Sequence, residues 1–487
     1  MQTDVGVYMK RIFLALSFLL FTIHSFGQKF SQYNTGTLYD SFENVSQKSY
    51  TPDSSRKYAF NFFIPNFSTS LYITGNSQAP LKSRAFLGYY NTSDLQIGQG
   101  KFNRNGTSIN SYFIMFKIFS SLDGNSELGF SAQTRGELRG VFSDESVALY
   151  NGAGAFPADH YDNAFNNSAT LLAYHQFSFS YREQISQKFA LGVKLSLLSG
   201  LQYQKINVNS SSIDIDRLND RADLTMQGKY YLSYTPGSFN GHDLLPTLRN
   251  PGASITLGTS LQTRDNFILQ FNVKDLGFIH WSKRSAIYNF AATRPIENLS
   301  TNQREHNIYD AAKNITHTNG IETSYVTPTY GKVELSANKN YWFDYDKRYR
   351  YAPTFIVSKE VFYPGFAAAL VNPVSYNNYT LSLTTAYDNY KIFSLGGQFM
   401  IKSPNAEFFI GSERLLATGS AILASAKSNT EINRRSAYSG MDIFLGATFK
   451  FGPVIEHPMN ASYVPLDYSP GFFTRLFNKI FNSPDNY

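Results

Sequence analysis

The chain has 487 residues, a formal net charge of +7 and no Cys, and its aromatic and charged fractions are both 16%. The missing Cys excludes disulfides, thiolate metal sites, a cysteine nucleophile and a lipidated N-terminus. Many aromatic and few charged residues exclude a disordered chain. The positive excess is small and dispersed, so nucleic acid is not an expected partner.

The N-terminus carries the pattern of a secretory signal. The basic pair Lys10-Arg11 precedes the apolar stretch Ile12–Ile23, and small residues follow it. This stretch is shorter than the about 20 residues that a membrane-spanning helix needs. We therefore expect a signal peptide over residues 1–27, with cleavage before Gln28.

Alternation of apolar and polar residues with a period of two dominates the rest of the chain, and helical periodicity is rare. Within 171–182, Phe177 and Phe179 share one face, while Gln176 and Ser178 share the other. This pattern predicts β-strands with one apolar face. The clearest examples are the hairpins 111–121 with 126–140, 171–182 with 188–197, and 254–261 with 267–281, and the strand 441–451.

The lengths of strands and links favour a transmembrane β-barrel over a soluble β-sandwich, which also alternates. Strands of about ten residues or more exceed the soluble norm of about 5–6 and fit a tilted crossing of about 9–11. We therefore predict an all-β fold, a transmembrane antiparallel β-barrel of about 14 strands, with 12 or 16 as alternatives. Aromatic residues near strand ends are expected to form interface girdles, for example Tyr174, Tyr181, Trp281, Tyr341 and Trp342.

The lengths of the links predict which strand ends face the same side. Short links are expected in the periplasm and long polar links outside the cell. This alternation of short and long links requires 203–216 and 221–234 to be two further strands. Beyond residue 330, the link lengths do not predict which side of the membrane each link is on. The short links are 122–125, 183–187, 217–220 and 263–266, and the long links are 142–167, 235–252 and 283–319.

The barrel is expected to span residues 28–452, and a periplasmic tail follows over 453–487. Within that tail, 471–481 is the one good amphipathic helix of the sequence. Such a helix lies on a membrane surface, docks on a protein partner, or packs at the barrel mouth. Its apolar face consists of Phe472, Phe473, Leu476, Phe477, Ile480 and Phe481.

Three segments are distinctive: Asp275-Leu276-Gly277-Phe278-Ile279-His280-Trp281, the stretch Tyr174–Gly200, and Phe408–Glu413 before 442–451. Together they resemble a family of outer-membrane β-barrels of unknown function in Bacteroidota. That family is distantly akin to the long-chain fatty-acid transporter barrel and to the shuttle barrel of type IX secretion. The resemblance implies fold and location, and no catalytic residue. Relatives often show Asn-Pro-Ala near the start, where this chain has Asn44-Val45-Ser46, which argues against a transporter-like N-terminal plug.

The inward faces of the predicted strands are polar. A polar lumen contains either water or a hydrogen-bonded plug. Its lysines either favour anionic solutes or pair with inward acids and close the barrel, and Gly192, Gly258 and Gly446 suit a tightly curved wall. The candidate lumen residues are Lys194, Lys274, Lys450, Gln270, Asn272 and Asp442, together with Thr256.

No catalytic site, metal site or cofactor is predicted. His160 lies in a polar loop, and His175 lies on an apolar strand face without a serine beside it. His280 is expected at the membrane interface. The pattern of Asp214, Asp216 and Asp220 lacks the glycine and the closing glutamate of a calcium loop.

The sequence therefore predicts an exported, non-enzymatic barrel in the Gram-negative outer membrane, surrounded by lipid. Its expected role is a transport-like or scaffold component of an envelope complex, with protein partners at the external loops or the C-terminal helix. The alternative is a pore or transporter for small hydrophilic or amphipathic molecules. An outer-membrane hydrolase is the remaining alternative, and no assembled site supports it.

Overall fold

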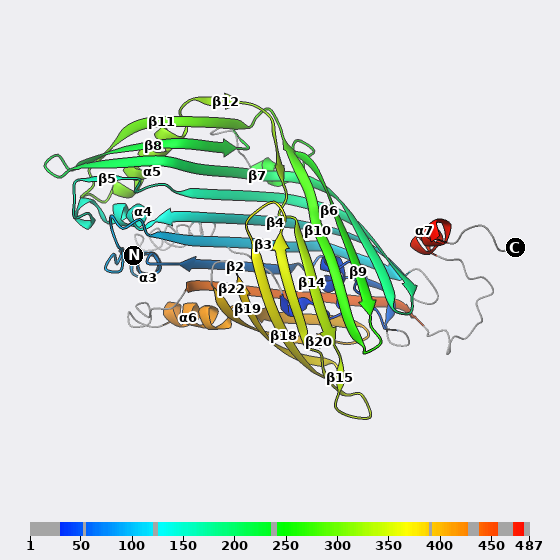
Figure 1. Ribbon diagram of the computed structural model, residues 1–487. Helices are drawn as coiled ribbons and strands as arrows, with labels where there is room; N and C mark the ends of the chain where they lie inside the picture. The colour runs from blue at the N-terminus through cyan, green and yellow to red at the C-terminus, as the bar shows by residue number, and fades with distance from the viewer. Residues whose placement is uncertain are drawn as a thin grey trace, which may run out of the picture.

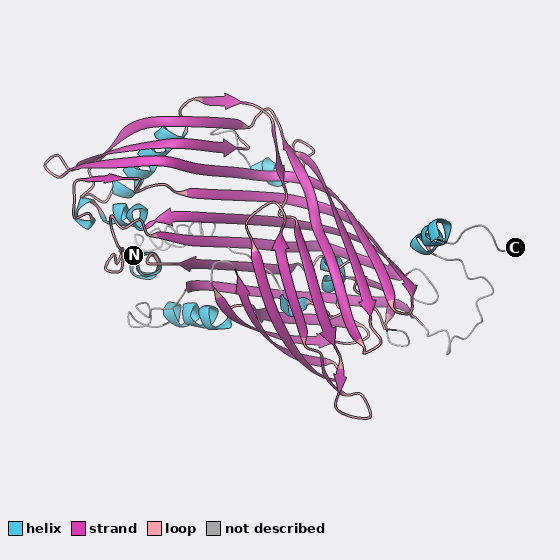
Figure 2. Ribbon diagram, viewed as in Figure 1, coloured by secondary structure: helices cyan, strands magenta, loops and turns pink. Residues whose placement is uncertain are grey.

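The computed structural model describes residues 30–51, 55–119, 125–234, 241–388, 392–426, 438–455 and 471–481. The expected signal peptide, residues 1–27, and its cleavage before Gln28 lie outside the described residues. Antiparallel pairing closes the strands into a ring (Figures 1 and 2).

The ring is a closed antiparallel barrel of 14 strands, which confirms the predicted fold class and strand number. It closes because the last strand pairs with the first two segments of strand, Leu445 with Phe67 and Phe449 with Phe60. In order around the ring, the positions are β1 (Arg56–Phe60) with β2 (Asn66–Thr74), β3 (Phe102–Phe119), β4 (Ser126–Ser143), β6 (Ser168–Ser186), β7 (Phe189–Asp216), β9 (Pro251–Gln262), β10 (Phe267–Trp281), β13 (Tyr325–Pro328) with β14 (Lys332–Lys339), β17 (Thr354–Glu360), β18 (Phe366–Tyr376), β19 (Tyr379–Asp388), β20 (Phe393–Lys402), β21 (Ala406–Ser412) and β22 (Tyr438–Val454).

Apolar side chains cover the outside of the wall. On β6 and β7, Phe179 and Leu195 are 54% and 55% exposed, whereas the alternating Gln176 and Ser178 are buried on the inside. A soluble protein has the opposite arrangement, because apolar surface is costly in water. Apolar residues outside and polar residues inside are the pattern of a transmembrane β-barrel.

The ring has two ends with different links. Short links at 187–188, 263–266, 377–378 and 403–405 meet at one end, here named the short-turn rim. The link between β4 and β6 lies at the opposite end, the long-loop rim, and contains α4 (Asp144–Ala148), η2 (Leu149–Asn151), η3 (Ala153–Ala155) and β5 (His160–Asp162). None of the helices among the described residues is long and apolar enough to cross a bilayer.

One continuous strand, β7, replaces the two strands predicted over 188–197 and 203–216. Gly200 lies between the two predicted strands, but it makes room for the Trp281 side chain and does not turn the chain. A Cβ at Gly200 would lie 2.8 Å from Trp281. Because β7 crosses the whole molecule, the link 217–220 lies at the long-loop rim and not at the short-turn rim, so its predicted side is wrong.

The outer half of β7 leaves the ring and supports a side sheet, at the upper left in Figure 1. This sheet contains β8 (Arg221–Leu232), β11 (Ala286–Glu297) and β12 (Gly320–Glu322), and α5 (Arg304–Thr316) packs on it around an apolar core. The stretch 283–319, predicted as an external loop, therefore contains a strand and a helix. The stretch 235–252 links β8 to β9 and includes η4 (Gly241–Leu244), which contacts the outer wall at His175.

A bulge in β10 reverses which residues face the lumen. Lys274 and Asp275 are consecutive and both buried inside, and Asp275 has a positive φ of 47°. One extra residue shifts the alternation, so that Trp281 points inward and is fully buried. Its predicted place in an interface girdle is therefore wrong. Tyr174 is buried in the same interior cluster, whereas Tyr341 and Trp342 are exposed.

The first strand position is interrupted between β1 and β2. Phe62 and Phe63 have positive φ values of 47° and 62° and project from the outer wall. Asn61 fills the resulting gap from the inside. Its Nδ2 donates to Tyr112 O at 3.1 Å, and its Oδ1 accepts the Met115 N–H at 3.0 Å. The side chain therefore replaces backbone pairing that the interruption removes.

Beyond residue 330, the strands are shorter but the alternation of ends continues. A hairpin of β14 and β17 is extended by β15 (Tyr341–Trp342) and β16 (Tyr349–Tyr351) past the short-turn rim. The long link after β21 lies at the long-loop rim and contains α6 (Leu415–Ala426). There Thr418 Oγ1 bonds to Asp442 N at 3.0 Å and covers an edge of β22 that β21 does not reach. The link after β21 therefore lies at the rim where the other long links lie.

The N-terminal segment fills the lumen as a plug, so the prediction against one is wrong. The plug consists of residues 30–50, with η1 (Phe30–Gln32) and α2 (Leu38–Glu43), and nearly all of its residues are buried. It is the dark blue segment inside the ring in Figure 1. Thr37 caps α2 by accepting the Asp40 N–H.

Candidate functional site: the plugged lumen

Wall cations hold the main chain of the plug. Lys194 Nζ on β7 donates to Phe42 O at 3.3 Å. Arg182 Nε on β6 donates to Ser46 O at 2.9 Å. Phe42 lies in the last turn of α2, where backbone oxygens have no intrahelical partner, and Ser46 lies in the segment after the helix. Lys194 therefore satisfies the end of the helix, and Arg182 holds the chain that follows it.

Wall carboxylates hold the plug from the other side of the ring. Glu407 Oε2 on β21 accepts the Leu38 N–H at 2.9 Å, at the first residue of α2. Glu413 Oε1 accepts the Ser31 N–H at 2.8 Å. Anions suit a helix N-terminus and cations a C-terminus, so the wall charges match the direction of α2.

Two wall glycines give the plug its space. A Cβ at Gly192 would lie 2.1 Å from Val45 O, and a Cβ at Gly258 would lie 2.9 Å from Val45 Cγ2. From the sequence, these glycines are expected to suit a tightly curved wall. Their place opposite Val45 shows that close approach of the plug is the reason. Inward glycines on adjacent predicted strands are the sequence signal that could have revealed it.

The apolar face of α2 packs against the wall near the interruption between β1 and β2. Leu38 and Phe42 are fully buried there. Tyr39 meets Tyr112 edge-on, with ring centroids 5.6 Å apart. The cluster is completed by Ala59, Met115, Met400, Phe409 and Phe444. The plug is thus held by an apolar contact on one side and by charges elsewhere.

Asp275, at the β10 bulge, joins the wall to the plug through Arg135. Arg135 Nη1 lies 2.5 Å from Asp275 Oδ2, and its Nη2 lies 2.6 Å from Glu43 Oε1 of the plug. Asp275 Oδ1 also accepts Gln176 Nε2 at 2.8 Å and lies 3.3 Å from Lys194 Nζ. The bulge supplies this geometry by turning an extra side chain inward.

The predicted inward lysines each face an acid. Lys274 Nζ lies 2.5 Å from Glu334 Oε2, and Lys332 Nζ lies 3.1 Å from Glu334 Oε1. Lys450 Nζ lies 2.5 Å from Glu407 Oε1. Lys194 faces Asp275, as described above. The lysines therefore form internal pairs rather than a surface open to anionic solutes.

The other predicted lumen residues are also buried on the inside, and each has a polar partner. The structure does not bring all of the predicted residues to one place, because they line the lumen from the plug to the long-loop rim. Gln270 Nε2 bonds to Gln47 Oε1 (2.6 Å), Asn272 Nδ2 to Asn44 Oδ1 (3.5 Å), Asp442 Oδ1 to Ser412 Oγ (2.6 Å), and Thr256 Oγ1 to Asp275 Oδ1 (3.2 Å).

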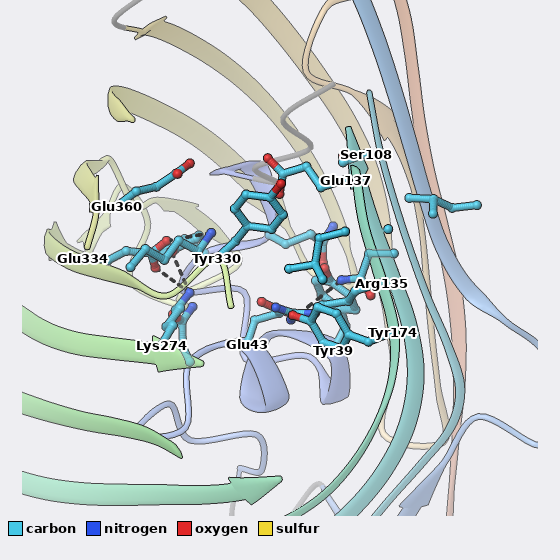
Figure 3. A pocket seen from close by; sticks show the side chains of 18 of the residues that line it. Tyr39, Glu43, Ser108, Arg135, Glu137, Tyr174, Lys274, Tyr330, Glu334 and Glu360 are labelled. Atoms are coloured by element: carbon cyan, nitrogen blue, oxygen red, sulfur yellow. Dashed lines mark hydrogen bonds and ion pairs between the residues drawn. The ribbon is translucent and has the colours of Figure 1, made fainter. Parts of the chain in front are cut away.

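A polar cavity of about 100 Å³ lies between the plug and the wall. Figure 3 shows Tyr39 and Glu43 of the plug with wall residues around them, so that acids, bases and tyrosines face the same space. Arg135, Glu43 and the tyrosines at this cavity were not identified from the sequence. Its lining includes Tyr33, Tyr39, Asp40, Glu43, Arg135, Glu137, Tyr174, Lys274, Tyr330, Lys332, Glu334 and Glu360.

Arg139 holds together three residues that line this cavity, Glu137, Tyr330 and Glu360. Its guanidinium lies 2.5 Å from Glu137 and 2.7 Å from Glu360. It also stacks over the Tyr330 ring, 4.3 Å from the centroid. A guanidinium held by two carboxylates and a ring keeps a fixed orientation. These contacts hold Glu137, Glu360 and Tyr330 together at this part of the cavity wall.

The candidate catalytic residues do not form a catalytic group. His160 Nδ1 lies 2.6 Å from Asp214 Oδ1 on the exposed side sheet, and this hydrogen bond raises the pKa of His160. Asp216 caps its own turn, and Asp220 bonds to Ser300, so each of the three aspartates has a different partner. The described residues contain no group of three or more His, Asp or Glu that could hold a metal.

The structure thus defines the class: a closed transmembrane barrel whose lumen is filled by its own N-terminal segment. The model of a family of unknown function, DUF5723, matches residues 51–413. The chain belongs to this family. Among curated proteins, none matches the sequence.

Several solved structures of other barrels are similar to this chain. A TodX deltaS2S3 mutant, a monoaromatic hydrocarbon channel, has 9% identity and a TM-score of 0.42, covering 88% of this chain and 96% of that one. A Pseudomonas aeruginosa FadL homologue has 11% identity and a TM-score of 0.39, covering 87% and 96%. The Pseudomonas putida toluene transporter TodX has 9% identity and a TM-score of 0.38, covering 84% and 93%. Because these TM-scores are all 0.42 or lower, we assign the architecture of this chain from its own strand pairings.

Proposed function

We propose that this protein is an outer-membrane transport barrel for small hydrophilic or amphipathic molecules, closed at rest by its N-terminal plug. The observation that carries the proposal is that one segment, the plug, obstructs a lumen lined by polar and charged side chains. Only non-covalent contacts hold the plug against the wall. Because the chain has no Cys, no disulfide can tie the plug to the wall. Movement of the plug would open a continuous polar path.

The lining of the cavity favours the pore or transporter, which was the alternative from the sequence, over the scaffold that the sequence favoured. A barrel that only scaffolds partners needs no polar cavity inside its wall. Here tyrosine rings and paired charges face the same space, which suits a solute with polar and apolar parts. The apolar outer surface supports a location in the outer membrane, with the short-turn rim in the periplasm.

A reversible disulfide lock tests the proposal. Ser31 Oγ of the plug lies 2.8 Å from Thr384 Oγ1 on β19, so a cysteine pair at these positions can be bridged. In liposomes that contain the double variant S31C/T384C, we expect solute-driven swelling to stop on oxidation and to recover on reduction.

The single variant S31C is the matched control, because it carries a thiol but cannot form the lock. Its swelling rate is expected to be the same in both redox states. Equal swelling of the oxidised and reduced double variant would contradict a gating plug. No swelling in any state would contradict transport.

A further inference from the structure

The C-terminal helix α7 (Phe472–Phe481) is attached to the barrel at its first turn. Glu183, at the end of β6, accepts the Phe473 N–H at 2.6 Å and the Thr474 N–H at 2.9 Å. A carboxylate at this position satisfies backbone donors that have no partner within the helix and complements the helix dipole. Gly471 permits the approach, since a Cβ there would lie 2.4 Å from the carboxyl carbon of Glu183.

The attachment places α7 on the outer side of the wall. Along β6, Arg182 and Ser180 face the lumen, so Tyr181 and Glu183 face outward. Tyr181 Oη accepts the Phe472 N–H at 3.2 Å, and the Phe473 ring lies 5.4 Å from the Tyr181 ring. Figure 1 shows α7 beside the short-turn rim, at the right of the barrel.

The helix has an uncovered apolar side and a basic polar side. Phe472 and Leu476 are 58% and 42% exposed. Within 472–481 there are two basic residues, Arg475 and Lys479, and no acidic ones. The side chains of Phe477, Ile480 and Phe481, which the sequence places on the same apolar face, lie outside the part that the structure describes.

The exposed apolar surface of the wall leads directly to this helix. Phe179, two residues before Tyr181 on the same outward face, is 54% exposed and belongs to the lipid-facing surface. Helix α7 therefore begins where that surface ends. A short amphipathic helix without acids, at the border of hydrocarbon and water, fits the phosphate headgroups of a bilayer.

We propose that α7 lies in the headgroup region of the leaflet at the short-turn rim, held to the barrel by Glu183. Its apolar side chains enter the acyl chains, and Arg475 faces lipid phosphates. The inference rests on the membrane location proposed above. Glu183 acts as a positioning residue, because it fixes where the helix starts and does not itself contact lipid.

The chain has no Cys, so single cysteines report on single positions. We would attach an environment-sensitive fluorophore at L476C, on the apolar side, and at N478C. Two residues turn an α-helix by about 200°, so these positions lie on opposite sides of α7. In nanodiscs of phosphatidylglycerol with brominated acyl chains, we expect loss of fluorescence at L476C and little loss at N478C.

Two controls separate the inference from the proposed membrane location. F179C lies on the wall and is expected to lose fluorescence in any membrane-inserted barrel. L218C, in the fully exposed turn after β7, is expected to keep it. Loss at F179C without loss at L476C would overturn the helix inference alone. No loss at either position would also contradict the membrane location.

A protein surface is the other occupant that the helix could find. If α7 docks on a second copy, L476C will keep its fluorescence and a bifunctional thiol cross-linker will give dimers. That result overturns the lipid proposal.

Replacing phosphatidylglycerol by phosphatidylcholine tests the charge, because Arg475→Gln is expected to reduce quenching in the anionic nanodiscs more than in the zwitterionic ones.

Discussion

Asn61 replaces strand pairing with a side chain at the interruption between β1 and β2. It is fully buried, and its amide contacts the main chain at Tyr112, Phe113 and Met115. Positive φ values at Phe62 and Phe63 show that the backbone is strained at this point. The strain persists because Asn61 satisfies the groups that the interruption leaves open.

Asn61→Ala is expected to destabilise the barrel by about 1–3 kcal/mol, since buried backbone groups would lose their partners. Urea unfolding followed by heat-modifiable gel migration measures the loss. Asn378→Ala, in an exposed turn, is the control and should change stability by less than about 0.5 kcal/mol. Equal effects of the two substitutions would show that the Asn61 contacts contribute nothing.

Asp40 makes docking of the plug depend on pH. Burial raises the pKa of this carboxyl from 3.8 to about 6, although the Asn44 amide, the Gly36 N–H, Lys274 and Lys402 favour its charge. The docked plug therefore binds the proton more tightly than the undocked plug. This contribution favours docking below the ordinary pKa and is lost as pH rises through about 6.

We expect the thermal stability of the wild type to fall relative to Asp40→Asn as pH rises from about 4 to about 7. The neighbouring Glu43 does not obscure the comparison. Burial raises its pKa, but Arg135 and two lysines outweigh that effect and keep it lowered. Parallel pH profiles of the wild type and the variant would contradict the expected titration.

At the scale of elements, the bulge in β10 determines the interior of the barrel. It places Lys274 and Asp275 side by side in the lumen and turns Trp281 inward against Gly200. Trp281 Nε1 then donates to Thr327 Oγ1 at 2.9 Å. Without the bulge, Asp275 and Trp281 would both face lipid. There the Asp275 carboxylate would lose Arg135 and Lys194, and the Trp281 indole N–H would lose Thr327.

Asp275→Asn keeps the backbone, because Asn tolerates the same positive φ. It removes the charge that Arg135 and Lys194 face, and we expect a loss of about 3 kcal/mol in stability, as for other broken buried pairs. The matched control is Asp265→Asn, in the exposed turn before the same strand. Chemical denaturation of both variants in one detergent measures the difference, and equal stability would contradict the central role of Asp275.

At the scale of the whole molecule, the ring and the plug are separable. Every pairing that closes the barrel lies between residues 56 and 454, so none involves the plug. The plug adds contacts across the lumen, from Glu407 on β21 to Lys194 on β7. The barrel should therefore close without it.

Deleting residues 30–50 is expected to leave a heat-modifiable barrel that is less stable and more permeable. Stability falls because wall charges such as Glu407 and Lys194 lose plug partners, and permeability rises because the lumen fills with water. Gel migration and liposome swelling measure the two effects. A deletion variant that folds but does not swell liposomes faster would show that the wall itself closes the lumen.

The sequence alone determined the main hairpins of the first part of the barrel and their apolar faces. Alternation is a local pattern, so the hairpins of β6 with β7 and β9 with β10 could be predicted with the correct inward residues before residue 274. The family-like stretch Asp275–Trp281 was also visible, although its role was not.

Only the tertiary structure decided what fills the barrel. The plug has no periodic pattern, and its contacts join residues far apart in sequence, such as Ser31 with Glu413. The bulge at Asp275 and the close packing at Gly200 depend on partners on other strands, Arg135 and Trp281. Local periodicity predicts which face of a strand a side chain occupies, because successive side chains along a strand point to opposite faces. Lumen contacts depend on how the ring closes, and that is a property of the whole chain.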